Sequence, residues 1–358
     1  MNRVYNFSAG PSQMSEQVLT KAASELLNYK ESGQSIMEMS HRSKEFLEVF
    51  ESCRSKLIKL MNIPSNYKVL FLQGGASLQF SMIPMNLLNK YKKAAVINTG
   101  AWSKKAIKEL KKFGDVEVVA SSEEDTFRYI PKDYEIPSDI DYFYICENNT
   151  IYGTKYHTLP DTKDIPLVAD LSSCILSEPI DVSKYGVIFA GAQKNLGMAG
   201  LTLVIIREDL IKEKDDLPSM LSYDVQASND SMFNTPPTYA IYMLGLVLDW
   251  IKDEFSTLEN LHAINKQKAN LIYEVLDESN FYQAVTNKED RSIMNIPFVT
   301  PSKELDESFI TQAKEQGMIN LKGHRSVGGM RASIYNAMDL QGVKHLVKFM
   351  KEFEERNK

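Results

Sequence analysis

Pro166-Leu-Val-Ala-Asp170 and Gly186-Val-Ile-Phe-Ala-Gly-Ala-Gln-Lys-Asn-Leu-Gly197 each contain a short apolar run and then turn polar. Runs that are apolar throughout, rather than at alternate positions, are typical of strands covered on both faces, as in a parallel sheet between helices. The first run ends on Asp170, and Lys194 follows the second, 24 positions later (194 − 170). Because ligands of such sheets bind beyond the carboxyl ends of the strands, these two residues mark a candidate site.

Further apolar runs alternate with helical patterns through the first two thirds of the chain, at residues 69–72, 94–98, 116–119, 142–145 and 201–206. This alternation predicts an α/β fold with a mostly parallel sheet between helix layers.

The last third of the chain has a different pattern. Two long helical patterns, at 236–255 and 258–276, precede a strand near 292–299, a helix near 304–316, a strand near 330–335 and a helix near 342–355. We therefore expect a large domain over residues 1–255 and a small α+β domain over residues 256–358, with residues 1–15 able to pack against the small domain.

The composition is that of an ordinary soluble enzyme, with 43% hydrophobic and 25% charged residues. A net charge of −6 disfavours nucleic acid as the main partner, because there is no basic excess to neutralise phosphates. The three cysteines, Cys53, Cys146 and Cys174, lack disulfide or zinc spacing, so no metal is expected. Neither a signal-peptide pattern nor an uncharged apolar run of the ~18 residues that a membrane span requires is present, so we expect a cytoplasmic protein with no membrane partner.

The pair Lys194 and Asp170 predicts a cofactor. A lysine that can form a Schiff base and a carboxylate that can face a pyridinium nitrogen are what pyridoxal 5'-phosphate requires of a protein. Taken singly, either residue has a simpler explanation: the lysine could begin a solvated loop and the aspartate could cap a helix. Residues that follow the other predicted strands strengthen the cofactor hypothesis.

Three of these neighbouring segments could each contact such a cofactor. Gln73-Gly-Gly-Ala-Ser-Leu-Gln79 joins a strand to a helix, so the amides of Ala76 and Ser77 could bind a phosphate, although Gly-Gly turns also occur for steric reasons alone. Trp102 could stack on a pyridine ring or simply pack in the interior. Thr150 could bond the ring hydroxyl, or its Asn-rich segment could be only a turn.

Basic residues in loops suggest a second kind of ligand. Two histidines directly precede arginines, in His41-Arg42 and His324-Arg325, and Arg331 follows soon after the second pair. The arginine side chain suits carboxylate or phosphate, so these loops favour a small anion with several charges. Taken alone, either pair is better explained as solvated surface charge.

Assembled, these segments resemble the phosphoserine aminotransferases, a family of class V, fold-type I enzymes that depend on pyridoxal phosphate. The resemblance runs essentially from end to end. The segments that carry it are Asn6-Phe-Ser-Ala-Gly-Pro11, Met39-Ser-His-Arg-Ser43, Gln73-Gly-Gly-Ala-Ser77, Thr99-Gly-Ala-Trp102, Asn149-Thr-Ile-Tyr-Gly153, Ala169-Asp-Leu-Ser-Ser173, Ala192-Gln-Lys-Asn195, Phe233-Asn-Thr-Pro-Pro237 and Gly323-His-Arg-Ser326.

The resemblance implies a role for each candidate cofactor residue. Lys194 would be the Schiff-base lysine and Asp170 the partner of the ring nitrogen. Trp102 would stack on the ring and Thr150 would hold its hydroxyl. The cofactor phosphate would be bound by Ala76, Ser77 and Gln193, and by Asn234 and Thr235 of the other subunit in a homodimer with composite active sites. Some relatives carry arginine where Ser77 stands, which leaves open how charge is balanced in this phosphate pocket.

The resemblance also implies the substrates. Arg331 would bind the substrate α-carboxylate, while a phosphate or a γ-carboxylate would be bound by His41, Arg42 and the neighbouring subunit's His324 and Arg325. The implied reaction is reversible ping-pong transamination of 3-phosphohydroxypyruvate and L-glutamate to O-phospho-L-serine and 2-oxoglutarate, in L-serine biosynthesis. The resemblance also allows activity on 4-phosphohydroxythreonine precursors in pyridoxine synthesis.

Three other functions fit the sequence less well. A class V desulfurase or lyase needs a nucleophilic cysteine after the Schiff-base lysine, but all three cysteines precede Lys194. An alanine–glyoxylate type of aminotransferase would not need two His-Arg loops for a second anionic group. A regulatory protein that binds pyridoxal phosphate without turnover would not need the complete set of Lys194, Asp170 and Arg331.

Overall fold

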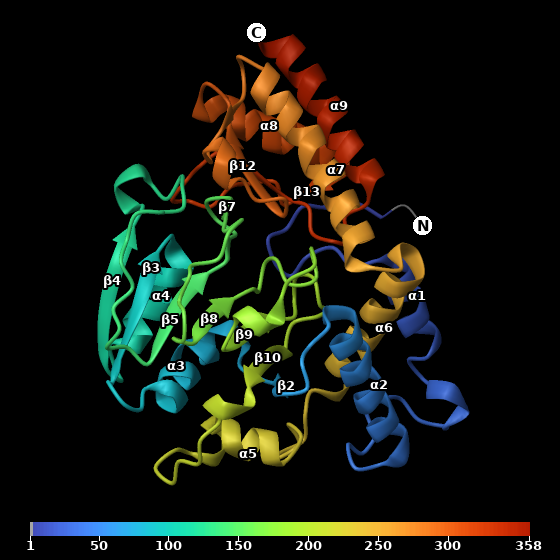
Figure 1. Ribbon diagram of the computed structural model, residues 1–358. Helices are drawn as coiled ribbons and strands as arrows, with labels where there is room; N and C mark the ends of the chain where they lie inside the picture. The colour runs from blue at the N-terminus through green and yellow to red at the C-terminus, as the bar shows by residue number, and fades with distance from the viewer. Residues whose placement is uncertain (1–2) are drawn as a thin grey trace.

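The computed structural model describes residues 3–358 (Figure 1). Residues 1 and 2, which the sequence assigns to the large domain, lie outside the described residues. The larger part is built on a seven-stranded sheet with the strand order β2-β10-β9-β8-β5-β3-β4. The bounds of these strands are β2 Tyr67–Leu72, β3 Lys93–Asn98, β4 Asp115–Ser121, β5 Tyr142–Cys146, β8 Leu167–Asp170, β9 Val187–Gly191 and β10 Thr202–Arg207.

The sheet is mostly parallel, which confirms the predicted fold class. Strands β9, β8, β5, β3 and β4 pair in parallel, whereas β10 runs antiparallel to both of its neighbours, β2 and β9. Strand β10 is nevertheless as apolar as the others, because it too is covered on both faces. The apolar runs therefore report burial, and strand direction has to come from the structure.

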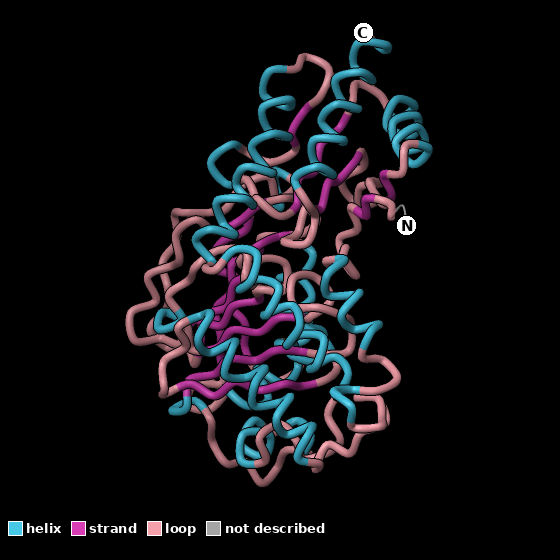
Figure 2. The backbone as a smooth tube through the Cα atoms, turned by 90° about the vertical axis from the view of Figure 1, so that its right-hand side faces the viewer, coloured by secondary structure: helices cyan, strands magenta, loops and turns pink. Residues whose placement is uncertain are grey.

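Alternate side chains of each strand enter two different cores. In β10, Leu203 and Ile205 belong to one core, and Val204 and Ile206 to the other. Helices α1, α2 and α6 cover the first face, and α3, α4 and α5 cover the second. Figure 2 shows the strands of the large sheet stacked in the lower body, with helices packed beside them. The helix bounds are α1 Glu16–Ser24, α2 Lys44–Met61, α3 Gly75–Leu87, α4 Ala101–Leu110, α5 Tyr223–Ser228 and α6 Thr238–Phe255.

Helix α2 was not predicted from the sequence, although its signals are present there. The Ser43 hydroxyl caps its first turn by accepting a hydrogen bond from the Phe46 amide at 3.2 Å. Apolar residues then recur at helical spacing and are buried, among them Phe46, Val49, Phe50, Cys53 and Leu57. The helix packs against α6. The loop that carries His41 and Arg42 directly precedes the helix and therefore lies at its amino end.

A smaller α+β part follows helix α6. Its antiparallel sheet has the order β11-β12-β14, and short strand β1, near the amino terminus, pairs with β13. The predicted boundary at residue 255 falls between α6 and α7, and the division into two domains stays a prediction. The bounds are α7 Leu258–Glu278, α8 Lys303–Glu315, α9 Leu340–Asn357, β1 Tyr5–Asn6, β11 Gln283–Ala284, β12 Asn295–Val299, β13 Met318–Ile319 and β14 Met330–Ser333.

Short elements complete the chain. The hairpin β6–β7, with strands Asn148–Asn149 and Thr154–Lys155, follows β5. Short 3-10 helices lie at Tyr29–Glu31, Glu123–Asp125, Val182–Lys184, Glu208–Leu210, Ser219–Leu221 and Lys288–Asp290. Of the helices in residues 3–358, none combines the length and the apolar character that crossing a bilayer requires.

A buried lysine on α7 joins this helix to the segment that follows β14. Lys268 is fully buried, and its Nζ lies 3.2, 3.0, 3.4 and 2.9 Å from the carbonyl oxygens of Ile334, Tyr335, Asn336 and Met338. Burying an ammonium group is costly unless it is hydrogen-bonded, and these carbonyls provide the acceptors. The lysine therefore fixes how the segment after β14 leaves the small sheet.

We expect Lys268→Met to lower the free energy of unfolding by about 1–3 kcal/mol, because the thioether cannot donate to the buried carbonyls. Urea unfolding followed by circular dichroism measures the change. The matched control is Lys266→Met, an exposed position on the same helix, which should stay within about 0.5 kcal/mol of the wild type. Equal effects at both positions would mean that the carbonyl contacts add nothing.

Candidate active site

Four of the predicted site residues lie at the carboxyl ends of neighbouring strands. Asp170 is the last residue of β8, and Lys194 comes three residues after β9 ends at Gly191. Thr150 lies in the turn of the β6–β7 hairpin that follows β5, and Trp102 lies in the first turn of α4, after β3. Because β3, β5, β8 and β9 are parallel, their carboxyl ends share one edge of the sheet.

The Lys194 side chain reaches two of these residues directly. Its Nζ donates a hydrogen bond to Thr150 Oγ1 at 3.1 Å and lies 6.0 Å from the centroid of the Trp102 ring. The amino-terminal segment lies against the same lysine: Ser12 Oγ donates to the Lys194 carbonyl at 2.6 Å. Gly10 of this segment has a φ of 141°, a conformation that residues with a side chain rarely adopt, so glycine suits this position beside the lysine.

Asp170 is a buried carboxylate whose charge is poorly compensated. The residue is 5% exposed, and its Oδ1 accepts a hydrogen bond from the Ser172 amide at 2.9 Å. Burial raises the pKa of Asp170, and the hydrogen bonds from Ser172 and the positive charge of Lys194 oppose this only in part. Within residues 3–358 it forms no ion pair, so the site suits a ligand that brings a positive charge to Asp170.

The amino end of α3 has free amides where an anion could bind. Gly74 precedes the helix with φ of 86°, and no side chain caps the end. The first intrahelical hydrogen bond is from the Leu78 amide to the Gly74 carbonyl at 3.3 Å, so the amides of Gly75, Ala76 and Ser77 come before the helical ladder. Such an end attracts phosphate through both its amides and the helix dipole.

Two buried nitrogens near these residues have no hydrogen-bond partner among residues 3–358: Trp102 Nε1 and Arg331 Nε. Buried donors are nearly always paired, so unpaired ones mark places where a bound molecule can supply an acceptor. Arg331 lies on β14, and burial lowers the pKa of its guanidinium. An anionic ligand would offset that burial.

Positive charges gather around His324. Burial, followed by the charges of Arg331, Arg325 and Lys105, lowers the pKa of His324. Lys105 also lies with its Nζ 4.4 Å from the centroid of the Trp102 ring. The sequence reasoning missed Lys105, although its position three residues after Trp102 places both on one face of a helix. Together these cations form an environment suited to carboxylates or phosphate.

The structure does not bring every predicted residue into this group. His41 is half-buried and Arg42 exposed in the loop before α2, and within residues 3–358 neither side chain bonds to the Lys194 group. Asn234 and Thr235 are exposed, and the Thr235 carbonyl accepts from Gln73 Nε2 of the same chain at 3.4 Å. Half-buried Gln193 directly precedes Lys194. The homodimer, and the service of His324, Arg325, Asn234 and Thr235 to the other subunit's site, stay predictions.

Comparison with known proteins shows the family to which the chain belongs. The family model described as aminotransferase class-V matches residues 4–346. The chain belongs to the class-V aminotransferases. A phosphoserine aminotransferase of Bacillus cereus is 56% identical to it over the full length of both chains.

Solved structures agree with this sequence match. The phosphoserine aminotransferase from Bacillus circulans subsp. alkalophilus has a TM-score of 0.97 and 44% identity and covers 99% of each chain. A phosphoserine aminotransferase from Trichomonas vaginalis, described as PLP bound, has a TM-score of 0.93 and 39% identity over 98% of this chain and 100% of that one. The fold is therefore that of a PLP-dependent transferase of fold type I.

The protein is accordingly a PLP-dependent aminotransferase, and the residues present fit this cofactor. Lys194 offers a primary amine, and Asp170 is a buried carboxylate without a cation. The indole of Trp102 lies beside Lys194, and the amino end of α3 offers free amides for a phosphate. In residues 3–358, no group of three or more His, Cys, Asp or Glu could hold a metal ion.

We expect Asp170→Asn to weaken PLP binding about 10- to 100-fold, which corresponds to losing the ~1.5–3 kcal/mol of a hydrogen bond to a charged group. Titrating the apoprotein with PLP and following its absorbance measures this affinity. The exposed Asp164 provides the control Asp164→Asn, which should bind PLP as the wild type does.

The same variant should show the opposite effect on the stability of the apoprotein. Because burial raises the pKa of Asp170, the folded chain binds this proton more tightly than the unfolded chain does. The contribution of Asp170 to stability therefore falls as pH rises from its unfolded pKa through its folded one. At pH 7 the apo form of Asp170→Asn should thus melt at or above the wild-type temperature, and a much lower melting temperature would contradict this account.

Proposed function

We propose that the protein is a phosphoserine aminotransferase that reversibly converts 3-phosphohydroxypyruvate and L-glutamate to O-phospho-L-serine and 2-oxoglutarate, in L-serine biosynthesis. One observation carries the proposal. Lys194 Nζ is hydrogen-bonded to Thr150 beside the Trp102 ring, and the buried Asp170 lies on the neighbouring strand. This arrangement occurs in a chain that is 56% identical over its full length to a relative named for this activity.

Bound PLP supplies an aldehyde that condenses with amines and a ring that takes up the electrons of a substrate carbanion. Asp170, buried and charged, would keep the ring nitrogen protonated. Lys194 would hold the cofactor and, when released by the substrate amine, would move the α-proton as a general base. Thr150, which already bonds Lys194 Nζ, would orient the ring through its hydroxyl. Each half of the reaction uses these same residues, which predicts ping-pong order.

Arg331 would bind the α-carboxylate that all four substrates share, through the planar fork of its guanidinium. The second anionic group is a phosphate in one pair of substrates and a γ-carboxylate in the other. We infer that it is bound by His41 and Arg42 together with the partner subunit's copies of His324 and Arg325. In the single chain Arg42, Asn234 and Thr235 are exposed and His41 is half-buried, which supports a homodimer in which the sites are completed across the interface.

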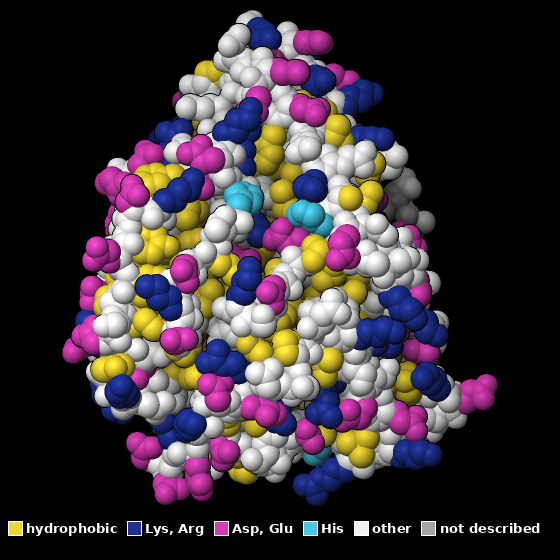
Figure 3. All heavy atoms as spheres, viewed as in Figure 1, with side chains coloured by type: hydrophobic (Ala, Val, Ile, Leu, Met, Phe, Trp, Pro, Cys, Tyr) yellow, Lys and Arg dark blue, Asp and Glu magenta, His cyan; other side chains and the backbone are white. Residues whose placement is uncertain are grey.

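Small molecules are the partners that the surface favours. On the face shown in Figure 3, basic and acidic side chains are interspersed, and the net charge is −6. Such a surface offers little attraction to nucleic acid. The cysteines Cys53, Cys146 and Cys174 are buried and free, which supports a cytoplasmic location.

The substrate is tested most directly by the visible spectrum of the holoenzyme. We expect O-phospho-L-serine, added without a keto acid, to convert the spectrum of the PLP form to that of the pyridoxamine form, while L-alanine and L-serine leave it unchanged. If L-alanine changes the spectrum and phosphoserine does not, the cofactor assignment remains and the substrate assignment is wrong.

Arg331→Lys should lower kcat/KM for phosphoserine about 100-fold, because an ammonium group cannot form the two parallel hydrogen bonds of a guanidinium with a carboxylate. PLP affinity should stay within twofold of the wild type, since Arg331 is assigned to the substrate. Steady-state kinetics and PLP titration separate the two effects. Arg356→Lys, at an exposed position on α9, is the control and should leave both values unchanged.

A further inference from the structure

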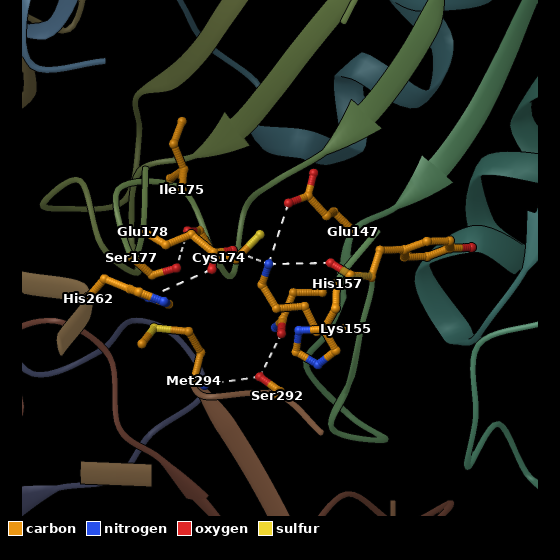
Figure 4. Close-up of polar contacts among 12 residues, drawn as sticks. Glu147, Lys155, His157, Cys174, Ile175, Ser177, Glu178, His262, Ser292 and Met294 are labelled. Atoms are coloured by element: carbon orange, nitrogen blue, oxygen red, sulfur yellow. Dashed lines mark hydrogen bonds and ion pairs between the residues drawn. The ribbon is translucent and has the colours of Figure 1, made fainter. Parts of the chain in front are cut away.

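A group of charged side chains lies buried behind the hairpin that carries Thr150 (Figure 4). Lys155 Nζ is hydrogen-bonded to Glu178 Oε1 and lies 3.6 Å from Glu147 Oε1. The side chains of Lys155 and Glu147 are only 4% and 3% exposed, and that of Glu178 is 20% exposed. Burying ions costs several kcal/mol each unless their partners are well placed, so a group of this kind has to be held by the surrounding structure.

Glu147 and Lys155 lie at the two ends of the hairpin whose turn contains Thr150. Asn148 and Asn149 pair with Lys155 and Thr154, so the two charged residues close the open end of this hairpin. The Tyr156 amide also donates to the Glu147 carbonyl at 2.9 Å. An ion pair across the open end of a hairpin fixes the direction in which its turn points, here the direction of Thr150.

The same residues tie the hairpin to the segment that begins at Asp170. The Glu147 amide donates to the Asp170 carbonyl at 3.1 Å. Asn148 Nδ2 donates to Ser173 Oγ at 2.7 Å, and Ser173 Oγ donates to the Asn148 carbonyl at 2.8 Å. Glu178 lies eight residues after Asp170, so its bond to Lys155 closes the far end of this connection.

The charges in this group support one another. Burial raises the pKa of Glu147, which Lys155 and the hydroxyl of Tyr185, donating at 2.8 Å, partly oppose. Burial by itself would lower the pKa of Lys155, but Glu147 and Glu178 outweigh it and the pKa is raised. His262 of helix α7 lies beside Glu178 in Figure 4, and its Nδ1 is 3.7 Å from Glu178 Oε2. Lys155 is therefore the positive centre for two carboxylates, the buried Glu147 and the partly exposed Glu178.

We propose that Lys155 is a positioning residue for the reaction: through Glu147 and Glu178 it holds Thr150 at a fixed place relative to Asp170. This rests on the proposed assignment of Thr150 and Asp170 to two sides of the cofactor ring. Thr150 also accepts the hydrogen bond of Lys194, so a shift of the hairpin changes the surroundings of the amine that joins the cofactor. Lys155 itself makes no bond to Lys194, Asp170 or Thr150 within residues 3–358.

The test compares Lys155→Met, which keeps chain length but removes the charge, with the exposed control Lys184→Met. We expect Lys155→Met to move the apparent pKa of the visible spectrum of the holoenzyme by about one unit, the equivalent of about tenfold in an equilibrium. We also expect PLP affinity to fall about tenfold and kcat to fall more than KM changes. Lys155→Arg, which keeps the charge, should recover at least half of the spectral shift.

A merely structural role would give a different result. If Lys155→Met lowers the melting temperature but leaves the spectral pKa and PLP affinity within twofold of the wild type, the proposal is wrong. Should Lys155→Met fail to fold, Glu178→Gln decides in the same way, since it removes one carboxylate and keeps Lys155. A wild-type holoenzyme that ignores phosphoserine would overturn the proposed substrate, whereas the spectral shift of the variants would still support the positioning role.

Discussion

The parallel direction of β5, β8 and β9 is the constraint on which the site depends. Asp170 is level with Cys146 on one neighbouring strand and with Phe189 on the other. The segments that follow these strands therefore all begin at the same edge of the sheet. Thr150 and Lys194, which are 44 positions apart in the sequence, can form a hydrogen bond there. Local sequence cannot bring such residues together; the sheet does so because its strands are buried on both faces and cannot shift without exposing apolar side chains.

The small part of the chain makes contacts at the loops that carry the site, and these contacts are polar. Asn295 of β12 accepts from Asn148 Nδ2 at 2.9 Å, and the Asn336 amide donates to Asn195 Oδ1 at 3.0 Å. Asn195 directly follows Lys194, and Asn336 follows the strand that carries Arg331. The segments that carry the two candidate residues, Arg331 for the substrate and Lys194 for the cofactor, are thus joined through one buried hydrogen bond. Directional bonds of this kind fix relative position, which apolar contacts between the same segments would leave less defined.

The strands and their polar ends could be predicted from the sequence, because burial on both faces leaves a continuous apolar run and the residue after it stands out. This found Asp170, Lys194, Trp102 and Thr150. The direction of β10 could not be predicted, since burial alone sets its composition. Nor could the sequence show that Lys155 is buried, because a lysine in a turn-rich segment is usually solvated and its partner Glu178 is 23 residues away. The roles expected for His41 and Arg42 involve a second copy of the chain, so they come only from the resemblance and stay predictions.

Buried polar groups at and near the candidate site differ in whether the chain itself supplies their partners. Lys155 and Lys268 are fully surrounded by partners that the chain itself supplies. Trp102 Nε1 and Arg331 Nε, by contrast, have no partner among residues 3–358, and Asp170 has no cation. A buried polar group without a partner costs free energy, and binding a charged ligand is one gain that can offset this cost. Trp102 Nε1, Arg331 Nε and Asp170 lie among the candidate site residues, where a bound cofactor or substrate would supply the missing partners. The contacts of Lys155 and Lys268 hold the segments around the site in place. Without such contacts, the unpaired groups of the site could move and pair with one another before a ligand binds.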